Sequence, residues 1–176
     1  MRKPIALVAL ALSALIFVGT QPALAASRTS ESIPAYANLS IEGTCGFTAT
    51  VDQRDPRTLT TWSDRGGSIV MQTVRTRTTT QYGGGPGGTM LLDENSLVTV
   101  KPNGDGGGTI MFVGSGAVWG FDSALGQPFF EWVSGVALMT GTFDPKTGVF
   151  VVSSKTILGQ ATPLCESLTT GLKPRH

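Results

Sequence analysis

The chain has very little histidine and cysteine. Its one histidine is the terminal residue His176, and its two cysteines, Cys45 and Cys165, do not have the CxxC spacing of redox or metal sites. These absences argue against a catalytic triad built on an internal histidine, against a cysteine nucleophile and against a metal centre. We expect no metal and no cofactor.

The chain also lacks a surplus of charge of one sign. It has 13 Lys and Arg residues against 12 Asp and Glu residues, and a leader that contains Arg2 and Lys3 would remove two of the basic ones. Proteins bind nucleic acids through a concentrated positive field. The composition therefore argues against a nucleic-acid partner.

The sequence has a long apolar run only at its start. The run over residues 5–18 follows two basic residues and is shorter than the roughly 20 residues that a transmembrane helix needs. Small residues up to Ala25 have the pattern of a signal-peptidase site. We expect a signal peptide over residues 1–25, a secreted protein, and no membrane span after cleavage. An uncleaved N-terminal anchor is the alternative.

The two cysteines lie near the two ends of the expected mature chain. In an oxidising compartment, Cys45 and Cys165 are expected to form one disulfide that ties the first strand to the last segment. A redox pair or a metal pair is the alternative.

Helical periodicity is absent as well. Runs rich in β-branched and apolar residues alternate instead with Gly, Pro, Asp and Asn, which predicts about seven or eight strands. Three such runs between residues 109 and 158 indicate a β-meander, with a hairpin turn at 143–148 and, earlier in the chain, a bulge near 93–95. We predict an all-β protein whose antiparallel meander closes into a small barrel of about eight strands. A two-sheet β-sandwich is the alternative.

The length suits one domain after removal of the leader. We expect a flexible N-terminal arm over residues 26–40, which is polar and interrupted by Pro34, and a single β domain over residues 41–170. A disordered tail is expected over residues 171–176.

Glycines recur inside the predicted strands. Gly114, Gly116 and Gly120 share one face of a strand, and Gly135 and Gly141 share a face of the next one. Glycine weakens the interior of a strand, so its recurrence indicates either strong sheet curvature or space kept open for a ligand. The sequence leaves both interpretations open.

The predicted function is binding, either of a small apolar ligand inside the barrel or of a protein or cell-surface partner. The candidate contacts for an apolar ligand are four aromatic residues, Phe112, Trp119, Phe130 and Trp132. Aromatic residues suit an ordinary core equally well. Arg75 and Arg77 lie two residues apart and therefore on one face of a strand, where they could contact an anion or simply be solvated.

An enzyme would depend on carboxylates, because internal histidine and free cysteine are missing. Asp122 and Glu131 flank the aromatic-rich stretch 121–132 and could form an acid/base pair as in glycoside cleavage, or could be surface residues. A barrel cyclase or isomerase and a structural protein of the cell envelope are further alternatives.

Four short segments, 44–47, 58–62, 141–144 and 164–168, resemble a group of uncharacterised secreted proteins of high-GC Gram-positive bacteria. Those proteins similarly begin their mature domain at a Cys-x-Phe strand and end it at a Leu-Cys-x-x-Leu segment. The resemblance implies export and the disulfide. It implies no activity and assigns no site residue.

Overall fold

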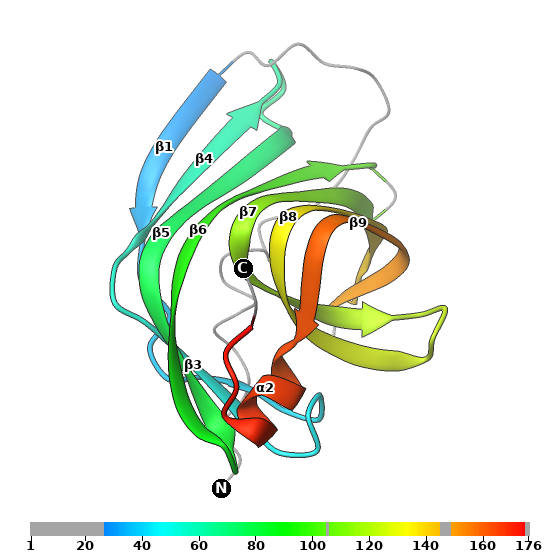
Figure 1. Cartoon of the computed structure of the whole chain (residues 1–176). Coiled ribbons are helices and arrows are strands. Elements are labelled where there is room, and N and C mark those ends of the chain that lie inside the picture. The colour runs from blue at the N-terminus through cyan, green and yellow to red at the C-terminus, as the bar shows by residue number, and fades with distance from the viewer. Residues whose placement is uncertain (1–26, 105, 145–148, 175–176) are drawn as a thin grey trace, which may run out of the picture.

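The computed structural model describes residues 27–104, 106–144 and 149–174. Strands dominate this part of the chain (Figure 1). The elements are β1 (Ser27–Ile33), β2 (Leu39–Ile41), β3 (Ala49–Gln53), β4 (Arg57–Ser63), β5 (Ile69–Gly85), β6 (Gly88–Pro102), β7 (Gly107–Asp122), β8 (Gln127–Phe143), β9 (Phe150–Pro163) and α2 (Leu164–Thr170). The predicted signal peptide over residues 1–25 and the centre of the turn predicted at 143–148 lie outside the described residues.

The strands form one nine-stranded sheet, which confirms the all-β class. From β4 to β9 each strand pairs antiparallel with the next, so the predicted meander is present and extends further than expected. The strands β1 and β9 stand at the two ends of this order and do not pair with each other. The structure therefore shows an open, strongly coiled sheet, without the barrel closure expected from the sequence.

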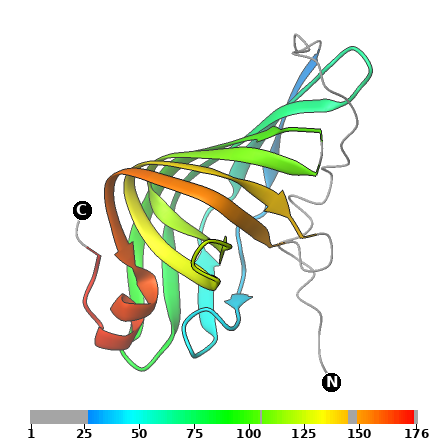
Figure 2. The same cartoon turned by 90° about the vertical axis from the view of Figure 1, so that its right-hand side faces the viewer.

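The β7–β8 hairpin bends back under the sheet (Figure 2). As a result, Phe121 and Asp122 at the end of β7 pair in parallel with Val151 and Val152 at the start of β9. This short parallel contact makes the otherwise antiparallel sheet mixed.

Three glycines, which we call the glycine crease, occupy paired positions on three neighbouring long strands. Gly114, Gly135 and Gly159 are opposite one another on β7, β8 and β9 and have φ angles of 120°, 136° and 129°. A Cβ atom at any of them would lie only 2.1 to 2.2 Å from a backbone oxygen of the neighbouring strand. Only glycine adopts this backbone without strain. For Gly114 and Gly135, the structure therefore supports the curvature interpretation.

The bent hairpin divides the interior into two cores. Core 1 consists of Ile41, Ala49, Val51, Tyr82, Met90, Leu92, Phe130, Trp132, Leu164 and Leu168. Core 2 consists of Phe112, Val118, Phe129, Val133, Ala137, Met139, Phe150 and Val152. Alternation along β8 sends Phe130 and Trp132 to core 1 and Phe129 and Val133 to core 2, so this part of the sheet is buried on both faces.

The predicted disulfide between Cys45 and Cys165 is present, with its Cα atoms 5.1 Å apart. It fastens α2 to the segment that precedes β3. The β5–β6 hairpin packs on the same helix, because the Gly87 N–H donates a hydrogen bond of 2.8 Å to the Leu168 carbonyl. These contacts hold α2 against core 1.

The N-terminal residues differ from the flexible arm expected over 26–40. Ser27–Ile33 forms β1 and pairs along its whole length with β4, and Leu39–Ile41 forms β2 and pairs with β3. This segment satisfies backbone groups that would otherwise be unpaired at the sheet edge, which its polar composition does not reveal. Of the predicted tail, residues 171–174 have no regular structure, yet Pro174 is buried.

Candidate functional site

The four aromatic residues predicted to contact a ligand lie in two different places. Phe112 is 1% exposed in core 2, whereas Phe130 and Trp132 are 2% and 1% exposed in core 1. Trp119 is half-buried beside core 1, with its ring centroid 6.4 Å from that of Phe130. These rings pack against the chain itself, so the described structure does not gather the four around one cavity.

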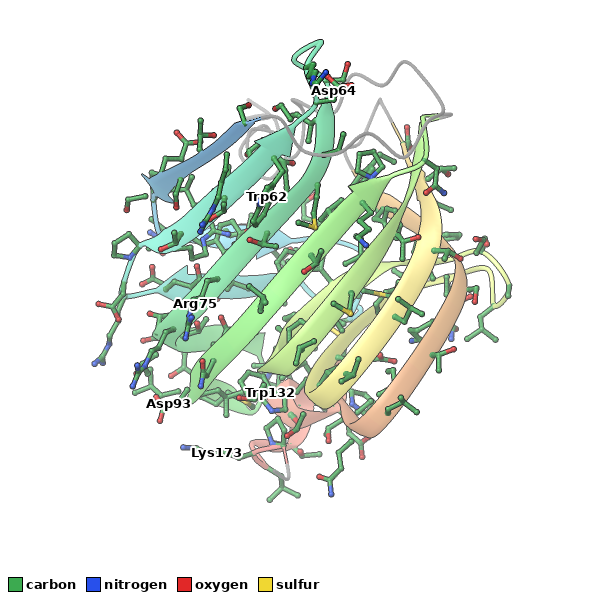
Figure 3. All side chains as sticks on the ribbon, turned by 90° about the horizontal axis from the view of Figure 1, so that it is seen from above. Trp62, Asp64, Arg75, Asp93, Trp132 and Lys173 are labelled. Atoms are coloured by element: carbon green, nitrogen blue, oxygen red, sulfur yellow. A yellow bond between two sulfur atoms is a disulfide. The ribbon has the colours of Figure 1, made fainter. Side chains whose placement is uncertain are left out.

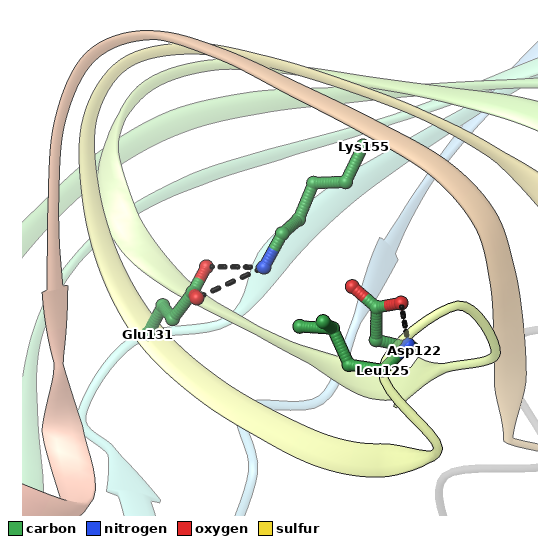
Figure 4. Close-up of polar contacts among 4 residues, drawn as sticks. All are labelled: Asp122, Leu125, Glu131 and Lys155. Carbon is green, nitrogen blue, oxygen red and sulfur yellow. Dashed lines mark hydrogen bonds and ion pairs between the residues drawn. The ribbon is translucent and has the colours of Figure 1, made fainter.

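Asp122 and Glu131 both lie within the bent hairpin, but each has its own partners (Figure 4). Asp122 Oδ1 accepts hydrogen bonds from the N–H groups of Ala124 and Leu125, at 3.0 and 3.1 Å, and so shapes the β7–β8 turn. Glu131 forms an ion pair with Lys155, whose Nζ lies 2.9 and 3.1 Å from the two carboxylate oxygens. These contacts give both carboxylates structural roles.

Next to core 1 lies a buried carboxylate that was not predicted from the sequence as a site residue. Glu94 on β6 is 7% exposed. Its Oε1 accepts a hydrogen bond from the Tyr82 hydroxyl, and its Oε2 accepts one of 2.9 Å from Gln53 Nε2. Burial, and next the neighbouring Glu94 charge, raise the pKa of Tyr82 well above its ordinary value. Tyr82 is therefore held as a neutral donor.

The polar contacts continue from Glu94 toward the surface. Gln53 Oε1 accepts a hydrogen bond of 3.3 Å from the Tyr36 N–H, and the Arg57 guanidinium stacks 3.7 Å from the Tyr36 ring centre. Arg57 also donates from Nη2 to the Pro34 carbonyl at 3.0 Å. This network braces β3, β5 and β6.

Glu94 was not predicted as an interior residue because a bulge was expected near residues 93–95. The structure has regular pairing there, with Thr78 opposite Glu94, and the irregularity lies instead between Tyr82 and Gly85. Strict alternation from Met90 through Leu92 would have placed Glu94 inside.

The convex outer face of the sheet carries large apolar side chains in register (Figure 3). One row of paired residues crosses β6 to β9 and consists of Leu97, Val113, Val136 and Leu158. A second pair, on β7 and β8, consists of Met111 and Leu138. The exposed fractions are 39% for Leu97, 39% for Met111, 38% for Val113, 45% for Leu138 and 68% for Leu158. We call these five exposed residues the apolar patch.

Basic residues border the apolar patch. Arg75 on β5 is directly opposite Leu97, and Arg77 follows on the same exposed face. Lys101 lies exposed at the other end of β6. Among the described acidic residues of β5 to β9, only Asp93 is on this face, where it accepts a hydrogen bond of 2.7 Å from the Thr79 hydroxyl. The outer face therefore combines apolar and basic character, and the two arginines predicted from the sequence are part of it.

Within the described ranges, no group of three or more His, Cys, Asp and Glu residues could hold a metal ion. The helix in these ranges is too short to cross a membrane. No protein-family model matches the chain, and no significant match is found among curated proteins or among solved structures.

Proposed function

We propose that the chain is an exported binding module that attaches to an anionic lipid surface through its outer face. The observation that carries the proposal is the apolar patch with Arg75, Arg77 and Lys101 at its border. The leader pattern supports export, and the disulfide between Cys45 and Cys165 is consistent with an oxidising compartment.

The continuity of the apolar patch supports a binding role. Single exposed apolar residues are common on soluble proteins, whereas contiguous ones mark contact surfaces for proteins or membranes. The row from Leu97 to Leu158 crosses four neighbouring strands, a width of about 14 Å at the usual strand spacing. The interior, by contrast, is filled by the chain's own aromatic side chains, which favours a surface partner over an enclosed apolar ligand. The proposal does not require the sheet to close into a barrel.

The charge distribution supports an anionic partner. Two copies that met through this face would bury its basic residues with only Asp93, among the described acidic residues of β5 to β9, to neutralise them, and unpaired buried charge disfavours association. An anionic surface would instead attract each basic residue by about 1 kcal/mol. Trp62, which lies on the same face with the Arg28 guanidinium 5.6 Å from its ring centre, suits the border between apolar and polar layers (Figure 3).

Sedimentation with vesicles tests the proposal. The protein is mixed with vesicles of phosphatidylcholine alone or with an equal part of phosphatidylglycerol. We expect binding to the anionic vesicles that weakens at high salt, because salt screens exposed charges. We also expect at least a fivefold loss for Leu138→Ser combined with Met111→Ser, and a loss at low salt for Arg75→Gln combined with Arg77→Gln.

Leu125→Ser is the matched control, because Leu125 is 67% exposed but lies in the β7–β8 turn, away from the outer face. Binding that is absent, or that falls equally in the control, overturns the proposal. A protein partner with an acidic surface would give the first of these results.

A further inference from the structure

The free side of β9 forms a groove with the C-terminal helix. A depression of about 550 Å³ lies between residues 159–162 of β9 and a second wall made of Glu166, Ser167 and Thr170 of α2 together with Leu172 and Lys173. Figure 1 shows α2 continuing directly from β9 and lying beneath the curled strands. This groove is separate from the apolar patch.

The lining of the groove shows that it follows the edge of the strand. Successive side chains of a strand point to opposite faces, so a depression on one face would contact only alternate residues. All four consecutive residues 159–162 line the groove. It therefore runs along the backbone of β9 and not across one face of the sheet.

The backbone on this side of β9 has few partners. One side of β9 pairs with β8 from Phe150 to Pro163, whereas on the other side the described structure pairs only Val151 and Val152, with β7. Alternate N–H and C=O groups beyond Val152 thus face away from β8. Natural edge strands are commonly protected by charges, prolines or bulges, yet residues 156–162 contain neither a charged residue nor a proline.

We propose that this groove binds an extended peptide, which adds to β9 as a further strand. Unpaired groups along a strand edge are matched by the main chain of another strand, which is how peptides bind by strand addition. The second wall stands beside this edge, so the added peptide would lie between β9 and α2. Glu166 and Lys173 carry opposite charges, so the groove suits an uncharged main chain, and the 71% exposed Leu172 offers an apolar contact to its side chains.

A labelled peptide tests the proposal in the absence of lipid. The probe is acetyl-Thr-Val-Thr-Leu-Thr-Val-Thr-amide with a fluorescein label, and its anisotropy is followed as the protein is added. We expect saturable binding. Methylation of alternate backbone nitrogens should weaken binding at least tenfold for one set of positions and little for the other set, because only one edge of the peptide would face β9.

A pair of variants locates the site. Thr170→Trp would fill the groove, whereas Thr169→Trp adds the same side chain at the neighbouring exposed position, which does not line it. Both threonines donate a hydrogen bond to a carbonyl four residues earlier, Thr169 to Cys165 at 2.8 Å and Thr170 to Glu166 at 2.9 Å, so both changes remove this kind of contact; Thr170→Trp also removes the hydrogen bond of 3.3 Å that Thr170 accepts from the Leu172 N–H. We expect at least a tenfold loss of affinity for Thr170→Trp alone. No binding, equal effects of the two variants, or equal effects of the two methylation patterns would overturn the proposal.

Discussion

Gly114 on β7 lies directly opposite Gly135 on β8, and both have positive φ angles, of 120° and 136°. With Gly159 they allow the β7–β8 hairpin to bend back so that the end of β7 reaches the start of β9. The bend creates both cores and leaves the other face of β6 to β9 as the outer face. A local backbone property of three glycines thus determines which side chains are available to a partner.

The glycine crease can be tested by adding a single methyl group. Gly135→Ala would place a Cβ 2.2 Å from the Leu158 carbonyl oxygen and would force alanine into an unfavourable φ. We expect a loss of about 2 to 3 kcal/mol in the free energy of unfolding, measured by urea denaturation. Gly66→Ala in the β4–β5 turn is the control, because a Cβ there would meet no backbone atom within 4 Å and only the Asp64 side chain, at 3.3 Å. Equal stability of both variants would contradict the account of the bend.

The disulfide is expected to contribute a large part of the stability. Replacing Cys45 and Cys165 together by serine frees a long loop in the unfolded chain and releases α2 from the segment before β3. We expect the free energy of unfolding to fall by about 2 to 5 kcal/mol, measured by thermal or urea denaturation. An unchanged melting temperature would mean that the packing of α2 alone closes core 1.

The buried Tyr82 hydroxyl predicts a loss of stability at alkaline pH. Its pKa is raised in the folded protein, so the unfolded chain releases this proton first. The stabilisation from neutral Tyr82 is complete below pH 10 and declines as the pH rises above it. Urea denaturation between pH 8 and pH 11 measures this effect, with Tyr82→Phe as the variant that should lack the Tyr82 part of the decline.

At neutral pH, Tyr82→Phe should also cost about 1 to 3 kcal/mol, because Glu94 loses a hydrogen-bond donor inside core 1. Tyr36→Phe keeps the Tyr82 contact and serves as the control. The same alkaline slope in Tyr82→Phe and in the unaltered protein would refute the assignment.

The ion pair between Glu131 and Lys155 is expected to be structural. The two side chains are 19% and 17% exposed, and Lys155 Nζ lies 4.3 Å from the centre of the Phe129 ring. We expect a coupling free energy of about 1 kcal/mol in a double-mutant cycle with Glu131→Gln and Lys155→Met, because the pair is partly screened by solvent. Additive effects of the two changes would show that the pair contributes nothing.

Alternation and turn residues were sufficient to predict much of the fold. Alternation puts Phe112 and Met111 on opposite faces of β7, and the structure shows which face is buried: Phe112 is 1% exposed and Met111 is 39% exposed. The cysteine pairing follows from there being only two cysteines in the chain.

The same reasoning missed features that depend on contacts between distant segments. The in-strand glycines indicate curvature but give no direction, so the folded-back hairpin and its contact with β9 were not predicted. The polar sequence of Ser27–Ile33 suits a loose arm until the unpaired edge of β4 is known. Glu94 was missed because a bulge was expected near residues 93–95, and its partners Gln53 and Tyr82 come from other strands.

The candidate site also depends on contacts between segments that are far apart in the sequence. Arg75 and Arg77 were correctly placed on one face, but the apolar residues beside them come from four further strands and become a patch only through the register of the sheet. No local motif encodes such a surface.

Fluorescence quenching by lipid tests most directly whether the outer face meets a lipid surface. The chain has three tryptophans, and Trp62 lies on the outer face, whereas Trp119 and Trp132 belong to core 1 and its border. With anionic vesicles that carry bromine on their acyl chains, we expect partial quenching of the tryptophan emission, and we expect Trp62→Phe to abolish it. Vesicle binding without quenching, or quenching that persists in Trp62→Phe, would contradict the assignment of the outer face as the binding surface.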